Sequence, residues 1–382
     1  MAEVSVAACA DYNPENCRRA LEQALEPVGG LSWVKPGMCI AVKANLVSYL
    51  KPEAAATTHP ALLCQLTQML RQRGARVIVG DSPGGLYTNA YVSRIYAATG
   101  MHEVEKAGAE LNRDFTQKQA QFPQAMVAKE FQYTAWLDQA DAVINFCKLK
   151  SHGMMGMSAA AKNLFGTIPG TMKPEYHFRF PNPQDFARMI VDLDEYWKPA
   201  LSIADAVVGM EGNGPTMGTP RHIGAVLAST SPHKLDLACA RLIGLQRQDV
   251  PTLQAAFERG LIPESVQQLD VAGDLEALVV RDFQNIETKN SLLFKNQFKG
   301  TAGEAFGRLA KACLGARPKV DKADCVGCGK CAGICPAKAI TMRKNLPAID
   351  RSACIRCFCC QEFCPKGAMR AARPAIARVL NR

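Results

Sequence analysis

Long apolar segments are absent from this sequence of 382 residues. No apolar run approaches the roughly 18 residues that a membrane-spanning helix needs, so we predict no membrane span. The first residues include Glu3 and have no basic region followed by a long apolar stretch, which argues against a secretory signal peptide. We therefore expect a cytoplasmic protein.

Motifs that bind nucleotides or nucleic acids are absent as well. The sequence has no Gly-x-Gly-x-x-Gly after a strand, no P-loop and no flavin signature. The missing signature leaves a flavin open, because many folds bind flavins without one. Nothing in the chain resembles a nucleic-acid-binding motif, so we expect no nucleic acid partner.

Cysteine and positive charge are abundant but unevenly placed. Nine of the 16 cysteines lie between Cys325 and Cys364, and the other seven are scattered. In a reducing cytoplasm, scattered cysteines usually behave as small buried side chains, whereas a dense group usually binds metal. From residue 286 onward, 19 Lys and Arg face 6 Asp and Glu, so the formal net charge of +10 belongs to the last quarter of the chain.

The dense group consists of two copies of one motif, C-x₂-C-x₂-C-x₃-C-P. The first copy runs from Cys325 to Pro336 and the second from Cys354 to Pro365. This repeat resembles the bacterial two-cluster ferredoxin and covers about residues 318–369. Pairs of Cys-x₂-Cys also form zinc ribbons, but zinc does not need three cysteines at this density followed by a proline. We therefore predict two 4Fe–4S clusters.

The ferredoxin resemblance implies which cysteines hold which cluster. In such ferredoxins the fourth ligand of each cluster comes from the opposite motif. The first cluster is then held by Cys325, Cys328, Cys331 and Cys364, and the second by Cys354, Cys357, Cys360 and Cys335. Cys359 has no place in this pattern and is expected to be a bystander.

Basic residues surround both motifs, for example Lys330, Arg356 and Lys366. Cationic side chains near a cluster stabilise its reduced form and attract acidic proteins. We expect an acidic redox partner of the flavodoxin or ferredoxin type. The alternative is a solvated basic face without a specific partner.

The first three hundred residues alternate strand and helix patterns, which predicts an α/β fold around a mostly parallel sheet with flanking helices. Strands are expected at Val4–Cys9, Met38–Ala44, Ala75–Val79, Ala142–Phe146, Leu201–Val208 and Ile223–Ala228, and helices at Pro14–Leu25, His59–Arg73, Asp185–Glu195 and His233–Leu245. We predict an α/β body over residues 1–293, a linker with a short helix over 294–317, and a small α+β ferredoxin-like domain with a basic tail over 318–382.

Polar residues cluster where these strands end. Ligands of parallel sheets bind beyond the carboxyl ends of the strands, so we expect one convergent site for a substrate or anion. Its predicted members are Lys43, Asn45, Asp81, Ser82, Lys148, Lys150, Asn163, Asp205, Glu211 and Asn213. Ser158 is expected to cap a helix that is aimed at the anion.

At these positions the body resembles the domain of unknown function 362 family, whose members often end in a two-cluster ferredoxin. The resemblance rests on five segments that occur in the family's order: Lys43–Asn45, Thr57–Pro60, Val79–Ser82, Lys148–Gly170 and Asp205–Pro215. The family brings no settled reaction.

The stretch His152–Gly170 is also similar to a segment of lactate racemase-type proteins, in which a lysine carries a nickel-pincer nucleotide and a histidine transfers protons. The resemblance implies Lys162 as the cofactor lysine and His152 as an acid or base, and leaves room for His59 as a second one. Three alanines at residues 159–161 replace the Gly-Gly-Arg of that pattern. A shared fold is therefore expected rather than a shared cofactor.

Three functions fit these observations. The first is an iron–sulfur oxidoreductase that delivers electrons to an anionic small-molecule substrate or a further, unidentified cofactor, with catalytic roles for His152, Lys162 and His59. The second is an electron carrier or docking protein without a substrate of its own. The third is racemase- or isomerase-like chemistry in the body, supported by the clusters.

Overall fold

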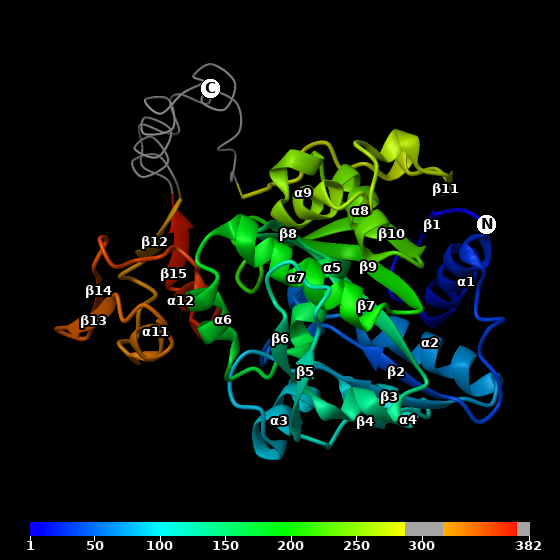
Figure 1. Ribbon diagram of the computed structural model, residues 1–382, viewed down its shortest axis with the longest axis horizontal. Coiled ribbons are helices and arrows are strands. Elements are labelled where there is room, and N and C mark those ends of the chain that lie inside the picture. The colour runs from blue at the N-terminus through cyan, green and yellow to red at the C-terminus, as the bar shows by residue number, and fades with distance from the viewer. Residues whose placement is uncertain (287–315, 373–382) are drawn as a thin grey trace.

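The computed structural model describes residues 1–286 and 316–372, which form a large α/β body and a small ferredoxin-like region (Figure 1). Most of the predicted linker and the end of the basic tail lie outside the described residues. Within the described ranges, none of the helices combines the length and the apolar character needed to span a bilayer.

A nine-stranded sheet forms the centre of the body (Figure 1). Its strands follow the order β11-β1-β10-β9-β7-β2-β3-β4, and β8 pairs with β7 beside this path. The neighbours from β9 to β4 are parallel, whereas β10 is antiparallel to both β9 and β1. The strands are β1 (Val4–Ala8), β2 (Cys39–Lys43), β3 (Arg76–Gly80), β4 (Glu110–Leu111), β7 (Ala142–His152), β8 (Gly156–Ser158), β9 (Leu201–Glu211), β10 (Thr219–Ser229) and β11 (Val271–Ala272). The predicted mostly parallel α/β fold is confirmed.

Helices cover both faces of this sheet. They are α1 (Pro14–Leu25), α2 (Pro60–Gln72), α3 (Asn89–Ala98), α4 (Met101–Lys106), α5 (Ala160–Asn163), α6 (Lys173–Arg179), α7 (Pro183–Trp197), α8 (Pro232–Leu242) and α9 (Pro251–Glu258). A separate hairpin consists of β5 (Gln117–Gln121) and β6 (Glu130–Thr134).

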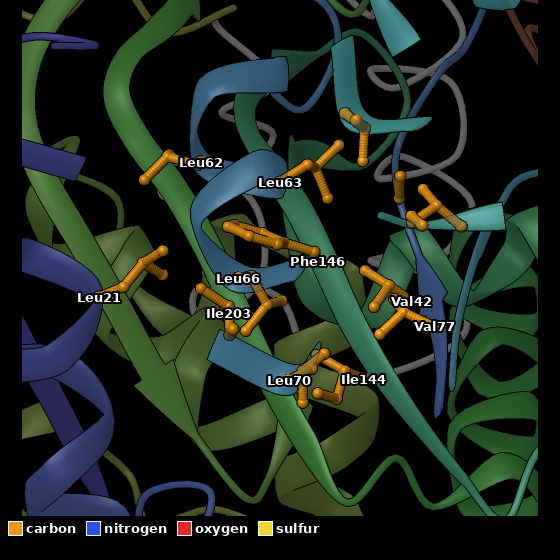
Figure 2. Packing of buried hydrophobic residues seen from close by; sticks show 14 of the residues in the cluster. Leu21, Val42, Leu62, Leu63, Leu66, Leu70, Val77, Ile144, Phe146 and Ile203 are labelled. Atoms are coloured by element: carbon orange, nitrogen blue, oxygen red, sulfur yellow. The ribbon is translucent and has the colours of Figure 1, made fainter. Parts of the chain in front are cut away.

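Alternation along the strands sends neighbouring side chains into different cores. Phe146 of β7 packs in the core beneath α1 and α2, whereas Cys147 packs in the core beneath α8. Leu62, Leu63 and Leu66 of α2 lie over the strands in Figure 2, at the helical spacing that the sequence predicts. These cores fix the positions at which β2, β7 and β9 present their polar residues.

Strands β7 and β9 are longer than predicted. We expected β7 to end at Phe146 because charged residues follow, but the strand continues to His152. Likewise β9 runs on from Val208 to Glu211. The charged residues remain within the strands because they are buried beside partners of the neighbouring elements, so placing Lys148 and Lys150 in a loop after the strand was wrong.

The ferredoxin-like region is built from two small sheets and two short helices. β12 (Arg317–Val320) pairs with β15 (Met369–Ala372), and β13 (Ile340–Arg343) pairs with β14 (Leu346–Ile349). Helices α11 (Lys330–Gly333) and α12 (Cys359–Glu362) each begin within one cysteine motif. The two motifs thus fold as a repeated unit.

Candidate functional site

Two cavities in the ferredoxin-like region are lined by cysteines of the repeat. Each combines three cysteines of one motif with the last cysteine of the other, the grouping that the ferredoxin resemblance predicts. The cavity of about 360 Å³ is lined by Cys325, Cys328, Cys331 and Cys364, and the cavity of about 320 Å³ by Cys335, Cys354, Cys357 and Cys360. Their roles as ligands stay a prediction.

The spacing of these cysteines suits a polynuclear group. In the part of the chain that the structure describes, no three His, Cys, Asp or Glu side chains gather closely enough to hold a single metal ion. Three thiols of one motif and the last thiol of the other line each cavity, which is the ligand set of a cubane cluster in two-cluster ferredoxins.

The two cavities differ in their exposure. The first, which we call the outer cavity, includes the exposed Cys328 and the 61% exposed Val326. The second, the inner cavity, includes the buried Cys357 and Cys360. Phe358 lines the inner cavity and belongs to the buried apolar group of the body around α6 and α7. The inner cavity therefore adjoins the body.

Helix α12 and the residue after it attach this region to the body. The side chain of Gln361 donates hydrogen bonds to the Asn213 side chain at 2.7 Å and to the Gly214 carbonyl at 3.1 Å. Phe363 packs against Gly84, where an added Cβ would lie 2.8 Å from the phenyl ring. The loop after β3 must carry glycine there for α12 to approach.

Between these two anchors, Glu362 reaches His152 at the end of β7. The Nδ1 atom of His152 accepts hydrogen bonds from the backbone N–H groups of Met154 at 3.1 Å and Met155 at 3.2 Å. The proton of the neutral ring is therefore on Nε2, which lies 2.9 Å from Glu362 Oε1. Burial, assisted by the Lys162 charge, lowers the pKa of His152 to about 4, so the ring is neutral at pH 7.

The lysines beside this pair repel one another, and burial disfavours their charged forms. Burial and the repulsion of Lys162 lower the pKa of Lys150 to about 7. Burial, with repulsion from Lys43 and Lys162, lowers the pKa of Lys173 to about 8. Burial alone would raise the pKa of Glu362, but Lys162 and His152 outweigh it and the pKa is lowered.

Two groups here have no polar partner. Lys162 makes no hydrogen bond or ion pair with residues 1–286 or 316–372, and its ammonium lies 5.8 Å from the centre of the Phe165 ring. His177, which is 2% exposed and stacks on Phe186, has no partner for Nδ1 within the same ranges. Burial lowers the pKa of His177 to about 3. We call His152, Lys162, His177 and Glu362 the Lys162 cluster.

A second group, the Asp205 cluster, contains Tyr12, His59, Lys148 and Asp205. Lys148 Nζ lies 2.9 Å from Asp205 Oδ2 and donates to the Tyr12 hydroxyl at 2.7 Å. Tyr12 donates to Asp205 Oδ1 at 2.9 Å, and the backbone N–H of His59 donates to Oδ2 at 2.9 Å. The His59 ring stacks on Tyr12 with 3.6 Å between centroids. The positive charge of Lys148 is therefore neutralised by the carboxylate of Asp205.

A third group joins β2 to the loop after β3. Lys43 Nζ lies 2.7 Å from Asp81 Oδ1 and donates to Asn163 Oδ1 at 3.2 Å. Asn163 in turn donates to the Asn145 side chain at 2.8 Å. Lys43 is therefore neutralised within the chain, and so is Lys148. Of the three lysines expected in the anion site, Lys150 has no ion-pair partner within the described residues, and the same holds for Lys162.

The remaining predicted site residues form hydrogen bonds with other residues of the chain. Asn45 accepts a hydrogen bond from Lys150 at 2.6 Å, and the Ser82 hydroxyl accepts one from the Gly170 N–H at 2.8 Å. Glu211 accepts one from the backbone N–H of Gln284 at 3.0 Å. Most of the predicted site residues thus bind other residues of the chain, and their role in binding a substrate stays a prediction.

Comparisons with known proteins agree with this architecture. Residues 40–241, more than half of the chain, match the model of the domain of unknown function 362. The chain belongs to this family. Residues 317–365 match a 4Fe–4S dicluster domain, so this family member binds two 4Fe–4S clusters and its C-terminal region has a role in electron transfer.

Two further proteins are similar to this family member. The thylakoid-associated protein sll1697 of Synechocystis sp. is 31% identical over 272 residues, which cover 69% of this chain and 81% of the relative. The lactate racemase apoprotein of Thermoanaerobacterium thermosaccharolyticum superposes with a TM-score of 0.41 and 13% identity, covering 64% of this chain and 58% of the racemase. A likeness this weak says nothing about a cofactor or a reaction.

In this family member the predicted cap of the helix after β8 was wrong. Helix α5 has only four residues, and its cap position is Ala159 rather than Ser158. The backbone N–H groups of Ala160 and Ala161 donate to the carboxylate of Asp236, at 2.6 and 3.1 Å. The chain's own carboxylate therefore occupies the place where we expected an external anion.

The sequence analysis missed four residues of functional interest: Lys173, His177, Asp236 and Glu362. Lys173 and His177 lie on α6, which is too short for a periodic pattern to reveal. Glu362 lies inside a cysteine motif that was assigned wholly to cluster binding. A signal was nevertheless present, because ferredoxin ligation does not require a charged residue between Cys360 and Cys364.

Proposed function

We propose that this protein is an iron–sulfur oxidoreductase in which electrons pass from the dicluster domain to an anion bound at the Lys162 cluster. One observation carries this proposal. Helix α12 contributes Cys360 to the inner cavity and also places Glu362 against His152. When bound, 4Fe–4S clusters supply one-electron transfer.

The residues of the Lys162 cluster have complementary roles in this proposal. Lys162 and His177, which lack polar partners within the described ranges, bind the anion. His152 is neutral and carries its proton on Nε2, so it can donate that proton to a reduced product and recover it. Phe358 packs among buried apolar residues and excludes water from the contact between the two regions.

The outer cavity supports docking of an acidic redox partner of the flavodoxin or ferredoxin type. Lys330 and Lys366 are exposed at its lining, beside Cys328 and Val326. Positive charge around an exposed apolar residue favours brief encounters with acidic proteins. We propose a cytoplasmic location, and the name of the thylakoid-associated relative makes attachment to a membrane surface the alternative.

The proposal is tested by reoxidation of the reduced clusters. Protein purified without oxygen is examined by mass spectrometry for a bound small anion, and cluster absorbance is then followed after reduction and addition of that anion. His152→Ala is expected to slow reoxidation by about 100-fold or more while leaving the cluster absorbance intact. An unchanged rate removes His152 from the mechanism.

His59→Phe is the matched control, because His59 lies in the Asp205 cluster and not beside α12. Its reoxidation rate should equal that of the unaltered protein. If no small molecule reoxidises the clusters and protein partners do, the chain is an electron carrier or docking protein. A covalent adduct on Lys162 in the intact mass would instead favour racemase- or isomerase-like chemistry.

A further inference from the structure

Glu362 belongs to the ferredoxin-like region, yet its surroundings are those of a bound anion. The carboxylate lies 2.9 Å from His152 Nε2, and its side chain is 18% exposed. Two polar groups without partners in the described residues, Lys162 and the Nδ1 atom of His177, lie beside Phe165, in the buried apolar group that also contains Phe358 of the ferredoxin-like region. His152, Lys162 and His177 belong to the body, on β7, α5 and α6.

The body offers Lys162 no carboxylate of its own. Asp81 is paired with Lys43 at 2.7 Å and Asp205 with Lys148 at 2.9 Å, and Lys162 has no ion-pair partner within the described residues. The carboxylate that lies against His152 is that of Glu362, from the ferredoxin-like region. This contact shows that the body accepts a carboxylate at this place.

Contacts on both sides of Glu362 hold α12 in place independently of this side chain. Gln361 is hydrogen-bonded to Asn213 and Gly214, and Phe363 packs on Gly84. The Glu362 side chain can therefore leave His152 by rotation while α12 remains attached. Displacement of Glu362 would not separate the inner cavity from the body.

We infer that Glu362 is a tethered competitor for the substrate: its carboxylate occupies the subsite into which a carboxylate of the substrate enters during turnover. This inference rests on the proposed function and names its substrate class, a small organic acid. Lys162 and His177 still lack polar partners within the described ranges when Glu362 is in place. The acid therefore has a further oxygen acceptor, as a dicarboxylate has.

Calorimetric titration of the full-length, oxidised protein with its clusters tests this inference, with malonate and acetate as probes. Malonate should bind more tightly than acetate. Glu362→Gln removes the tethered charge and should lower the Kd of malonate at least tenfold, and adding Lys162→Met to this variant should raise it again at least tenfold. Glu175→Gln, at an exposed position of α6, is the matched control and should leave the Kd unchanged.

The inference is overturned if Glu362→Gln binds malonate no more tightly than the unaltered protein, or more weakly. It is also overturned if the tighter binding survives Lys162→Met. Glu362→Ala serves in the same way if the glutamine variant does not retain its cluster absorbance. Binding needs no electron transfer, so tight malonate binding without reoxidation by any organic acid would refute the proposed function and not the subsite.

Discussion

The Asp205 cluster and the Lys162 cluster are built from the same residue types but have different charge balance. Both combine a lysine, a histidine and a carboxylate on or beside β7. In the Asp205 cluster, Lys148 and Asp205 face each other in strand register and form an ion pair. In the Lys162 cluster, the main counter-ion comes from another region of the chain. The proposed anion site therefore rests on the missing partner of Lys162, whereas the Asp205 cluster is a matched pair.

The largest effect is expected from breaking the Asp205 cluster. Asp205→Ala leaves the fully buried Lys148 without its carboxylate, so we expect the free energy of unfolding to fall by about 3–5 kcal/mol. Urea unfolding followed by circular dichroism measures it. The double variant Lys148→Met, Asp205→Leu should recover most of the loss. A loss under about 1 kcal/mol would mean that this pair is not structural.

Lys162→Met is expected to reduce activity without reducing stability. Removing this lysine relieves repulsion at Lys150, so the free energy of unfolding should stay the same or rise. Reoxidation of the clusters by the substrate should slow by about 100-fold, which corresponds to roughly 2.7 kcal/mol. Stopped-flow absorbance measures the rate. A variant that is destabilised but fully active would show that Lys162 stabilises the fold, as Asp205 does, and does not bind the substrate.

The stability of the protein should also depend on pH through Lys150 and Lys173, which lie beside the Lys162 cluster. The pKa values of Lys150, about 7, and Lys173, about 8, lie below the ordinary 10.5, so the unfolded chain binds more protons between pH 7 and 10. The stability of the protein relative to its Lys150→Met variant should therefore rise with pH across this window.

Anion binding should change in the other direction with pH. The charged lysines attract the probe below pH 7, so malonate affinity should fall about tenfold between pH 6.5 and pH 9. Titration calorimetry at several pH values measures this change. The decrease should be smaller in Lys150→Met, and an affinity independent of pH would show that Lys150 and Lys173 keep their charge throughout.

The smallest effect is expected at His59. Its Nδ1 accepts a hydrogen bond from the Ala61 N–H at the start of α2, and its ring stacks on Tyr12. His59→Phe keeps the stacking and loses this helix cap, which should cost about 1 kcal/mol in thermal unfolding. His59→Asn should retain the cap. A reoxidation rate that falls more than about threefold in either variant would place His59 in the mechanism.

Local patterns predicted the grouping of the cysteines and most strands of the central sheet. The cysteine repeat needs few residues to define its grouping, and apolar runs such as Cys39–Lys43 define the strands of the sheet. The pairing of Lys148 with Asp205 could not be predicted, because it depends on the register between strands that are distant in the chain. Helix α6 was missed because two turns carry no measurable period.

The contact between Glu362 and His152 was beyond the reach of pattern analysis for a different reason. It joins two regions whose folds are each explained without it. A sequence pattern reports what a segment needs for its own fold, whereas a docking contact depends on the shape of another region. For this reason the grouping of the cysteines around two cavities could be predicted from the sequence, and the residue that links this region to His152 could not.

The attachment of α12 limits how freely the ferredoxin-like region could be replaced by a dicluster domain of another protein. In the first motif the three residues before the last cysteine are Ala332, Gly333 and Ile334, whereas in the second they are Gln361, Glu362 and Phe363. All three of the latter contact the body. A dicluster domain transplanted from another protein would keep its clusters and lose these contacts. A transplanted domain would therefore need Gln361, Glu362 and Phe363 at these positions to restore its contacts with the body.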